Sequence, residues 1–391
     1  MRYTLPMKRG IATFTLDYGK CPKWLFDRMV LLGREIVDIM VQEYGPDEVV
    51  KRLGDPVWFQ SLGTVLAFDW NASGLTTILT AALKEAIRGR EQELGLFICG
   101  GKGKTSLKTP DEIIQWSERS GIAEERSQAL VYNSKMSAKV DSSLLQDGYA
   151  IYHHAFFFTK SGAWAVVQQG MDTKSQTARR YHWFSADVQD LIREPHSGIM
   201  AQKKVHTLDM TANASEASRD MSVELANDSF FALMKDIRLL RKYSTKLNQM
   251  VSLELESETL TLLNLENTEF KTHPVVNEDF SRSKYLEKIL YLVTQTKPKT
   301  YEEFVAMKGV GPKTVRALSL VGEIIYGAKP SYEDPSRYSF AHGGKDYTPY
   351  PVDRPTYDQT IDTLAKAVEK SHINPSEKAK VLNRLYKKEK E

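Results

Sequence analysis

The chain of 391 residues has only two cysteines, Cys21 and Cys99. Two cysteines are too few for a disulfide framework or a four-cysteine zinc site, so they favour a reducing setting. Long apolar runs are also missing, and the first ten residues are charged without the apolar segment of a secretion signal. These absences predict a cytoplasmic protein that has no membrane partner.

The chain also lacks a strong excess of either charge. Its formal net charge is +3, and 41% of its residues are hydrophobic and 26% charged, which is typical of a globular protein of two or three domains. This balance neither demands nor excludes nucleic acid, because a local basic patch is what binds phosphate. For the basic C-terminus, a solvated helix end and a DNA-contacting tail are equal alternatives: Lys378, Lys380, Arg384, Lys387, Lys388 and Lys390.

The segment from Met307 to Leu318 combines two glycines, a proline and basic residues. Gly309 and Gly311 predict a tight turn, and Pro312 predicts the start of a second helix, where a missing N–H costs nothing. Outward N–H groups and the helix dipole would then hold a phosphate oxygen. This pattern predicts a helix-hairpin-helix that grips a DNA backbone without reading sequence; an ordinary glycine–proline connection is the alternative. The predicted DNA-binding residues are Gly309, Val310, Gly311, Lys313, Thr314 and Arg316.

Residues 132 to 184 contain the densest polar chemistry. Ala150–Thr159 and Ala163–Gln169 read as two strands of a β-hairpin. Their neighbours His153 and His154 would point to opposite faces unless a bulge intervenes. Because buried polar groups without partners cost free energy, we expect this region to line a wet cleft.

Charged and polar side chains around this hairpin form the candidate catalytic set. Asp141 and Asp147 are the tentative metal ligands, because carboxylate oxygens suit Mg²⁺ or Mn²⁺. Lysine and arginine would neutralise a transferred phosphate. The set is Asp69, Lys102, Lys139, Asp141, Asp147, His154, Gln168, Arg179, Arg180 and His182.

The order of these segments predicts an α+β protein. Residues 1–200 would form an N-terminal mixed α/β domain that contains the β-hairpin. Residues 201–222, poor in large apolar side chains, read as a linker. Residues 223–391 would form a mainly α-helical helix-hairpin-helix domain with a basic tail. A first strand is expected within Arg2–Thr15, and Thr300 and Glu303 fit a capping box.

Along its whole length the sequence resembles an archaeal and thermophile bacterial family catalogued as a domain of unknown function. That family usually has a histidine where this chain has Asn71, so whether Asn71 marks an impaired site is left open. The segments that carry the resemblance are Phe68–Thr77, Gly100–Lys104, Lys139–Asp141, Asp147–His154, Val166–Met171, Ala178–Trp183 and Gly309–Asp353.

Ser283–Asp353 is also similar to the DNA glycosylases that contain a helix-hairpin-helix. In those enzymes a lysine in the Gly-x-Gly-x-Lys turn attacks the sugar, and an aspartate in a Val-Asp step assists. The resemblance therefore implies Lys313 as nucleophile and Asp353 as the assisting carboxylate. The Lys329–Tyr350 segment separates these two residues further than in the glycosylases.

Three functions compete on these observations, and all have DNA as the partner. The first is a metal-dependent nuclease involved in DNA repair, with chemistry in the N-terminal half. The second is a base-excision glycosylase or AP lyase that uses Lys313 and Asp353. The third is a non-catalytic DNA-binding protein. We favour the first, because the N-terminal half concentrates charged side chains that binding alone does not require. A homo-oligomer, the metal's identity and the type of DNA damage are left open.

Overall fold

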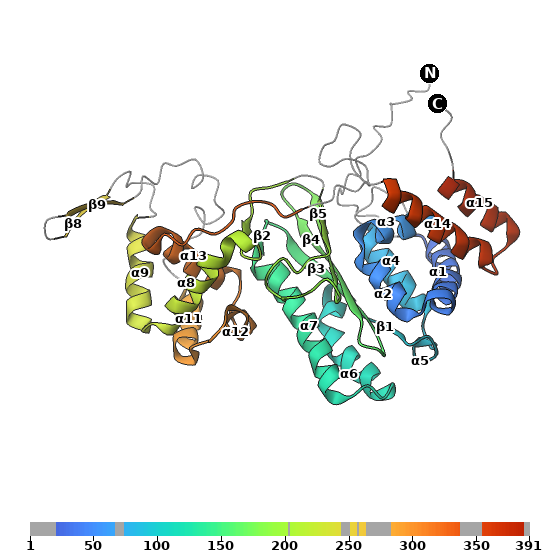
Figure 1. Cartoon of the computed structure of the whole chain (residues 1–391), viewed down its shortest axis with the longest axis horizontal. Coiled ribbons are helices and arrows are strands. Elements are labelled where there is room, and N and C mark those ends of the chain that lie inside the picture. The colour runs from blue at the N-terminus through green and yellow to red at the C-terminus, as the bar shows by residue number, and fades with distance from the viewer. Residues whose placement is uncertain are drawn as a thin grey trace, which may run out of the picture.

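The computed structural model describes residues 21–66, 74–201, 204–243, 251–255, 258–262, 283–336 and 354–386. The predicted first strand and the site residues Asp69 and Asp353 lie outside these ranges, as does Asn71. Figure 1 shows a central sheet between two groups of helices, with a further group of helices at one end of the molecule.

The centre of the molecule is a five-stranded antiparallel sheet in the order β1-β3-β4-β5-β6. The predicted β-hairpin is confirmed as β3 paired with β4, with a bulge between Ile151 and His153. The bounds are β1 Leu96–Lys102, β3 Ala150–Thr159, β4 Trp164–Asp172, β5 Thr177–Phe184 and β6 Gly198–Met200.

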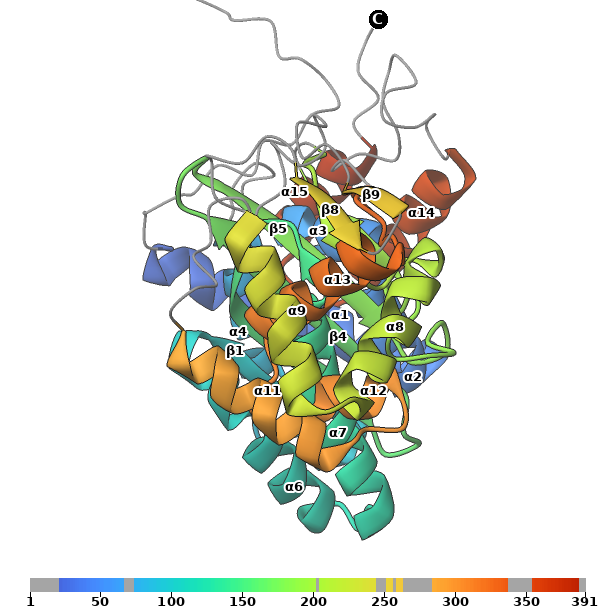
Figure 2. The ribbon, with the colours of Figure 1, turned by 90° about the vertical axis from the view of Figure 1, so that its left-hand side faces the viewer.

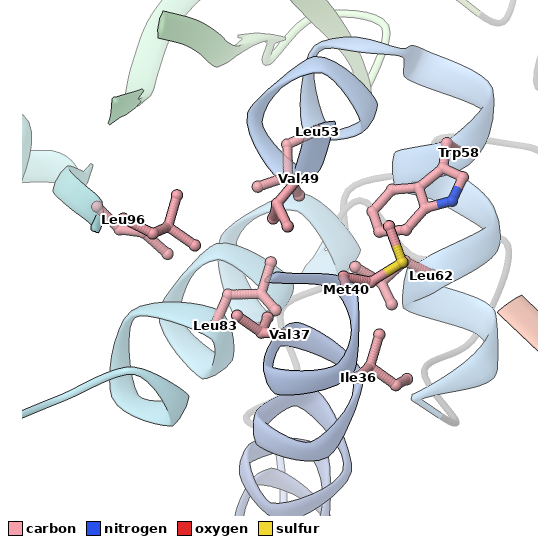
Figure 3. Close-up of a pocket in the computed structure, with 10 residues that line it drawn as sticks. Ile36, Val37, Met40, Val49, Leu53, Trp58, Leu62, Leu83 and Leu96 are labelled. Atoms are coloured by element: carbon pink, nitrogen blue, oxygen red, sulfur yellow. The ribbon is translucent and has the colours of Figure 1, made fainter. Parts of the chain in front are cut away.

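Four helices from the start of the chain cover one face of this sheet (Figure 1). They are α1 Lys23–Tyr44, α2 Pro46–Gly54, α3 Pro56–Val65 and α4 Gly74–Ala86, and the short α5 Glu91–Leu94 follows them. Asp55 caps α3, since its Oδ1 accepts hydrogen bonds from the amides of Val57 at 2.7 Å and Trp58 at 3.1 Å. Figure 3 shows apolar side chains of these helices and β1 around a cavity of about 10 Å³. A dry gap of this size is a packing defect and not a ligand site.

The other face of the sheet packs against α6 Thr109–Arg119 and α7 Glu124–Ser143, which follow the short 3-10 helix η1 Gly103–Lys108. Val140 of α7 packs there with Phe156, Phe158 and Trp183, all fully buried. The same apolar cluster continues into the next group of helices through Leu290 and Leu318, among others. The two parts of the chain therefore share one core.

That group consists of α8 Glu216–Asn227, α9 Phe230–Tyr243, α11 Lys284–Thr296, α12 Tyr301–Ala306 and α13 Pro312–Tyr326. Figure 2 views it in front of the sheet. The remaining short elements are β2 Leu145–Gln146, β7 Leu208–Asp209, η2 Asn213–Ser215, β8 Val251–Leu255 and β9 Glu258–Leu262. The segment predicted as a linker thus holds β7, η2 and the start of α8. Asp209 orders it by accepting hydrogen bonds from Thr211 and Ala212.

The last two helices, α14 Arg354–Lys370 and α15 Pro375–Tyr386, pack against α1 and α3 (Figure 1). Leu364, Val368 and Val381 are buried in the same apolar cluster as α1–α4. The order of segments in the sequence predicts that these residues belong with the C-terminal helices, whereas in the structure they pack on the N-terminal part. The physical reason is that α1 and α3 present apolar faces, on which the apolar sides of α14 and α15 are buried.

Candidate functional site

The turn between α12 and α13 is built from both sides by local hydrogen bonds. One half of the predicted capping box is present at the start of α12, because Thr300 Oγ1 accepts from the Glu303 amide at 3.1 Å. Glu303 Oε2 accepts from the amide of Lys299, the residue before the N-cap, at 2.7 Å. Gly309 then has φ +92°, and a Cβ at this position would lie 2.4 Å from Ile289 Cδ1. Only glycine fits this position.

Gly311 differs from Gly309, because the space that a side chain would occupy at Gly311 is open. Its φ of −152° is ordinary extended backbone, and a Cβ there would meet no atom within 4 Å. Gly311 is the N-cap of α13, has no side-chain cap and is followed by Pro312. The first turn of a 15-residue helix thus begins at an uncovered glycine, the arrangement that can receive an oxyanion.

The predicted DNA-binding residues divide into two groups. Lys313 is exposed on the turn, and so is a second lysine, Lys308, which is not among the predicted DNA-binding residues. Val310, Thr314 and Arg316 are buried beneath the turn. Arg316 is 8% exposed, and its Nε donates to Gln146 Oε1 at 2.5 Å. Arg316 therefore supports the turn from within.

Two residues of the N-terminal part hold this turn in place. Lys139 of α7 donates from its Nζ to the Met307 carbonyl at 2.5 Å, and partial burial lowers the pKa of Lys139. Gln146 donates from its Nε2 to the carbonyls of Pro312 at 3.0 Å and Ser143 at 2.9 Å. Lys139, which is predicted as a catalytic residue, thus contacts the turn between α12 and α13 and not the other predicted catalytic residues that the structure describes.

Asp141 stands at the centre of a buried network on the α7 face of the sheet. It is fully buried, and its Oδ1 contacts His196 Nε2 at 2.6 Å. Its Oδ2 accepts from Trp183 Nε1 at 3.1 Å and from Gln168 Nε2. Gln168 Oε1 in turn lies 3.0 Å from His154 Nδ1. Since that amide oxygen only accepts, His154 carries its proton on Nδ1, and burial lowers its pKa, so the ring is neutral.

Asp147 belongs to a second buried network on the same face. Its Oδ2 accepts from Arg179 Nη1 at 3.0 Å and from the Tyr181 hydroxyl at 2.6 Å, and its Oδ1 accepts from the Tyr149 amide at 3.0 Å. Arg179 also forms a two-pronged pair with Asp334, with Nη2 to Oδ2 at 2.6 Å. Burial opposes ionisation of Asp334, but the Arg179 charge outweighs it and lowers the pKa of that carboxyl.

These networks bear on the predicted metal ligands. All four carboxylate oxygens of Asp141 and Asp147 already contact protein donors, in two separate networks. The two residues therefore do not fit a shared Mg²⁺ or Mn²⁺ site in this conformation. Among the residues that the structure describes, no group of three or more His, Cys, Asp and Glu side chains could hold a metal ion.

A row of four polar residues crosses the sheet and contacts the α4 side. Strand pairing places Lys102 of β1, His153 of β3, Gln169 of β4 and Arg180 of β5 next to one another. We call these four the α4-side row. It runs from the exposed Lys102 to the fully buried Arg180. Lys102 and Arg180 belong to the predicted catalytic set, whereas His153 and Gln169 do not.

Each buried member of the α4-side row has a polar contact, either with a helix on that face of the sheet or with a neighbouring strand residue. Arg180 donates from Nη2 to Gln60 Oε1 at 2.9 Å and from Nη1 to Thr76 Oγ1 at 3.4 Å, and burial lowers its pKa to about 9. His153 Nε2 lies 3.2 Å from Thr80 Oγ1, and Gln169 Nε2 donates to the Tyr152 hydroxyl. Tyr152 is the extra residue of the β-bulge.

Two neutral histidines on this face each keep one ring nitrogen without a described partner. Thr80 Oγ1 donates to the Thr76 carbonyl at 2.9 Å, so it accepts from His153 Nε2, and His153 Nδ1 is left as an unprotonated base. Burial, with the neighbouring charges, lowers the pKa of His153 to about 3. His182 donates from Nδ1 to the Leu53 carbonyl at 3.2 Å, and its Nε2 has no partner in the described ranges.

The expected wet cleft is not what this region forms. Asp141, Gln168, Arg179, Arg180 and His182 are each 0% exposed. Their polar groups find partners inside the fold, from residues as distant in sequence as Gln60 and Asp334. Lys102, at the outer end of the α4-side row, is the predicted catalytic residue that stands exposed among those described.

Comparison with known proteins bears on the whole of this arrangement. A family model described as "Protein of unknown function (DUF763)" matches residues 10–352, which include the α4-side row, both buried networks and the turn before α13. The chain belongs to this family. The resemblance to an uncharacterised family is thus confirmed. No curated protein and no solved structure matches the chain. In the described ranges of this family member, no helix is long and apolar enough to cross a membrane.

Proposed function

We propose that the chain binds the sugar–phosphate backbone of DNA at the Met307–Lys313 turn, as a helix-hairpin-helix does, without reading base sequence. The observation that carries this proposal is the open N-cap of α13 at Gly311, flanked by two exposed lysines. Backbone N–H groups at a helix start favour an oxyanion, and Lys308 and Lys313 add charge beside it.

The support beneath the turn strengthens the proposal. A phosphate site works best when its donors are fixed before the ligand arrives. Gly309 has a left-handed backbone with no room for a side chain beside Ile289, while Lys139 and Gln146 tie the Met307 and Pro312 carbonyls to the N-terminal part. The two carbonyls are thereby engaged on the inner side of the turn.

The test is Gly311→Val with labelled duplexes of unrelated sequences. A valine side chain enters open space at an extended residue, so the fold persists while the approach of a phosphate is blocked. We expect affinity to fall at least tenfold, and equally for all sequences. Lys313→Gln should reduce the salt dependence by about one counterion. Lys366→Gln, at an exposed position on α14, is the control. Unchanged affinity of Gly311→Val at two salt concentrations would contradict the proposal.

For the reaction, we propose phosphodiester cleavage on the N-terminal part, in a DNA-repair context. The α4-side row supports it: Lys102 is exposed at its outer end, and Arg180 adds positive charge at its buried inner end. Cations stabilise the charge on a phosphate. A divalent metal stays part of the proposal, but Asp141 and Asp147 do not fit as its ligands.

The glycosylase or lyase alternative rests on Lys313, which is exposed on the turn; its partner Asp353 lies outside the described residues. The two reactions separate cleanly. Cleavage that needs Mg²⁺ or Mn²⁺ and is lost in Lys102→Gln supports the nuclease. An adduct trapped by borohydride at an abasic site in EDTA, and lost in Lys313→Gln, supports the lyase. Binding without either product supports a non-catalytic protein.

We also propose a cytoplasmic location, in line with two free thiols, Cys21 and Cys99. Cys99 is buried, and burial raises its pKa well above the ordinary value. A thiol of this kind is unreactive. The two free cysteines therefore do not require an oxidising compartment.

A further inference from the structure

A cleft of about 500 Å³ lies between α8, the start of α12 and the loop after β5. It is separate from the α4-side row and is not part of the proposed DNA-binding turn. Among its lining residues are Asp190, Arg219, Asp220, Lys299, Tyr301 and Glu302. Three segments distant in sequence thus converge on one polar cleft, the type of place where ligands bind.

Arg219 is the unusual member of this lining. It is only 3% exposed, and its Nη1 donates to the carbonyls of Met210 at 2.8 Å and Ala212 at 2.7 Å. Its Nη2 is buried and has no hydrogen-bond partner among the described residues, and no described carboxylate forms an ion pair with it. Glu216 and Asp190 act on the Arg219 charge only from beyond ion-pair distance, and burial still lowers its pKa. A buried charge without a direct ion pair is costly, so its retention needs a reason.

Tyr301 supplies a second unpartnered donor in the same cleft. Its side chain is 8% exposed, and its hydroxyl has no partner in the described part of the chain. Burial raises the pKa of Tyr301, so the hydroxyl keeps its proton at neutral pH. A guanidinium N–H and a phenol O–H are both donors, and both suit the oxygens of an anion.

The charges of the lining set the size of that anion. Asp190 is engaged by Arg193 and by the Ile192 amide, and Glu302 accepts from the Tyr132 hydroxyl at 2.6 Å. Arg193 also pairs with Glu216. Lys299 and Arg219 then stand against Asp220 and Glu302, so the charges of the lining cancel. Binding of an anion therefore rests on the two unpartnered donors, and the carboxylates of the lining repel an extended polyanion.

We propose that this cleft binds a phosphate monoester, with Arg219 and Tyr301 donating to its oxygens and Lys299 facing it from the outer lining. Binding gives each unpartnered donor the acceptor that it lacks. The ester is that of a small molecule such as a nucleoside monophosphate or that of a DNA 5′ end, and the experiment distinguishes these two sources. The inference does not depend on the proposed DNA-binding turn.

The test titrates the full chain with inorganic phosphate and with adenosine 5′-monophosphate in a calorimeter. Tyr301→Phe removes only a hydroxyl that has no partner, so thermal stability should hold or rise while phosphate affinity falls about tenfold. Tyr132→Phe, beside the cleft, is the matched control, because it loses the bond to the lining residue Glu302 but no proposed ligand contact. Gly311→Val should keep phosphate binding at the cleft.

A 5′-phosphorylated oligonucleotide is compared with the same oligonucleotide without the phosphate. A preference for the phosphorylated strand that Tyr301→Phe abolishes assigns the cleft to DNA ends. Tighter binding of the free nucleotide, lost in the same variant, assigns it to a small molecule. The proposal is overturned if neither phosphate nor nucleotide binds at millimolar concentration, or if Tyr301→Phe binds both as the parent does.

Discussion

At the scale of single residues, Gly309 and Gly311 have different reasons to be glycine. Gly309 has a left-handed backbone and a neighbour 2.4 Å from any added Cβ, whereas Gly311 has ordinary backbone and free space. The first glycine is required by the fold, and the second leaves room for whatever approaches the turn. Stability and binding can therefore be separated within one turn.

We expect Gly309→Ala to destabilise the protein more than Gly311→Ala does. The left-handed backbone alone costs about 1–2 kcal/mol for alanine, and the displacement of Ile289 adds to it. Gly311→Ala replaces only an N-cap glycine, which costs less than about 1 kcal/mol. Urea unfolding of the two variants measures the difference. Equal losses would show that Gly309 is not held as described.

Buried neutral histidines predict a loss of stability in acid. The pKa of His153 is about 3 in the folded chain, against about 6.5 when it is unfolded. Between these values the unfolded state binds the proton and the folded state does not, so stability falls as pH drops below about 6.5. His154 and His182 are shifted in the same direction.

We expect the free energy of unfolding to fall by about 1.4 kcal/mol per pH unit for each such histidine below that pH. Urea unfolding at pH 7.5, 6.5 and 5.5 measures the slope. His153→Gln should make it shallower, and the exposed His372, replaced by Gln, serves as the control. A slope that is the same with and without His153 would contradict its burial as a neutral ring.

Residue patterns alone predicted part of the site and mispredicted its surroundings. Gly309, Gly311 and Pro312 encode the turn within a few residues, so its shape could be predicted. The partners of Arg179 and Asp141 include Asp334 and His196, which lie 155 and 55 residues away. No local pattern reveals such pairs, and for this reason the polar density of residues 132 to 184 suggested a cleft instead of closed networks.

At the scale of elements, the segment after α13 is fastened to the sheet by one carboxylate. Asp334 pairs with Arg179 and accepts from the amides of Val205 at 2.7 Å and Ser336 at 2.9 Å. Ser331 adds a β-bridge to Asp209. The end of the helical group is therefore joined to β5 through a buried charge.

We expect Asp334→Ala to cost about 3 kcal/mol, because removing one partner of a buried pair leaves the other under-compensated. Hydrogen exchange should also accelerate at the Val205 and Ser336 amides. Asp27→Ala, which breaks an exposed pair with Lys23 on α1, is the control and should leave stability nearly unchanged. Unfolding curves that match for the two variants would argue against the role of Asp334.

At the scale of the whole molecule, the C-terminal helices complete the N-terminal core. Leu364 of α14 is fully buried in the cluster of α1–α4, and Lys366 on the same helix is exposed. The sequence could show that this helix is amphipathic, but it could not show which surface receives it. Helix existence follows from local periodicity, whereas docking depends on faces that meet only after folding.

We expect Leu364→Ala to lower stability by about 2–4 kcal/mol through lost packing and a new cavity. Lys366→Ala should change it by less than about 0.5 kcal/mol. Thermal and urea unfolding measure both variants. If Leu364→Ala unfolds like the parent, α14 does not cover α1 in solution.

The position of α14 also has a consequence for synthesis. Domains generally fold while the chain is being synthesised, and synthesis adds roughly 5–20 residues per second. Here the surface that α1 and α3 present is covered by helices made after the sheet, the turn and all of α8–α13. Because α14 is made long after α1 and α3, these two helices wait roughly ten seconds or more for their apolar cover. During that interval a nascent-chain chaperone would find its binding surface on α1 and α3.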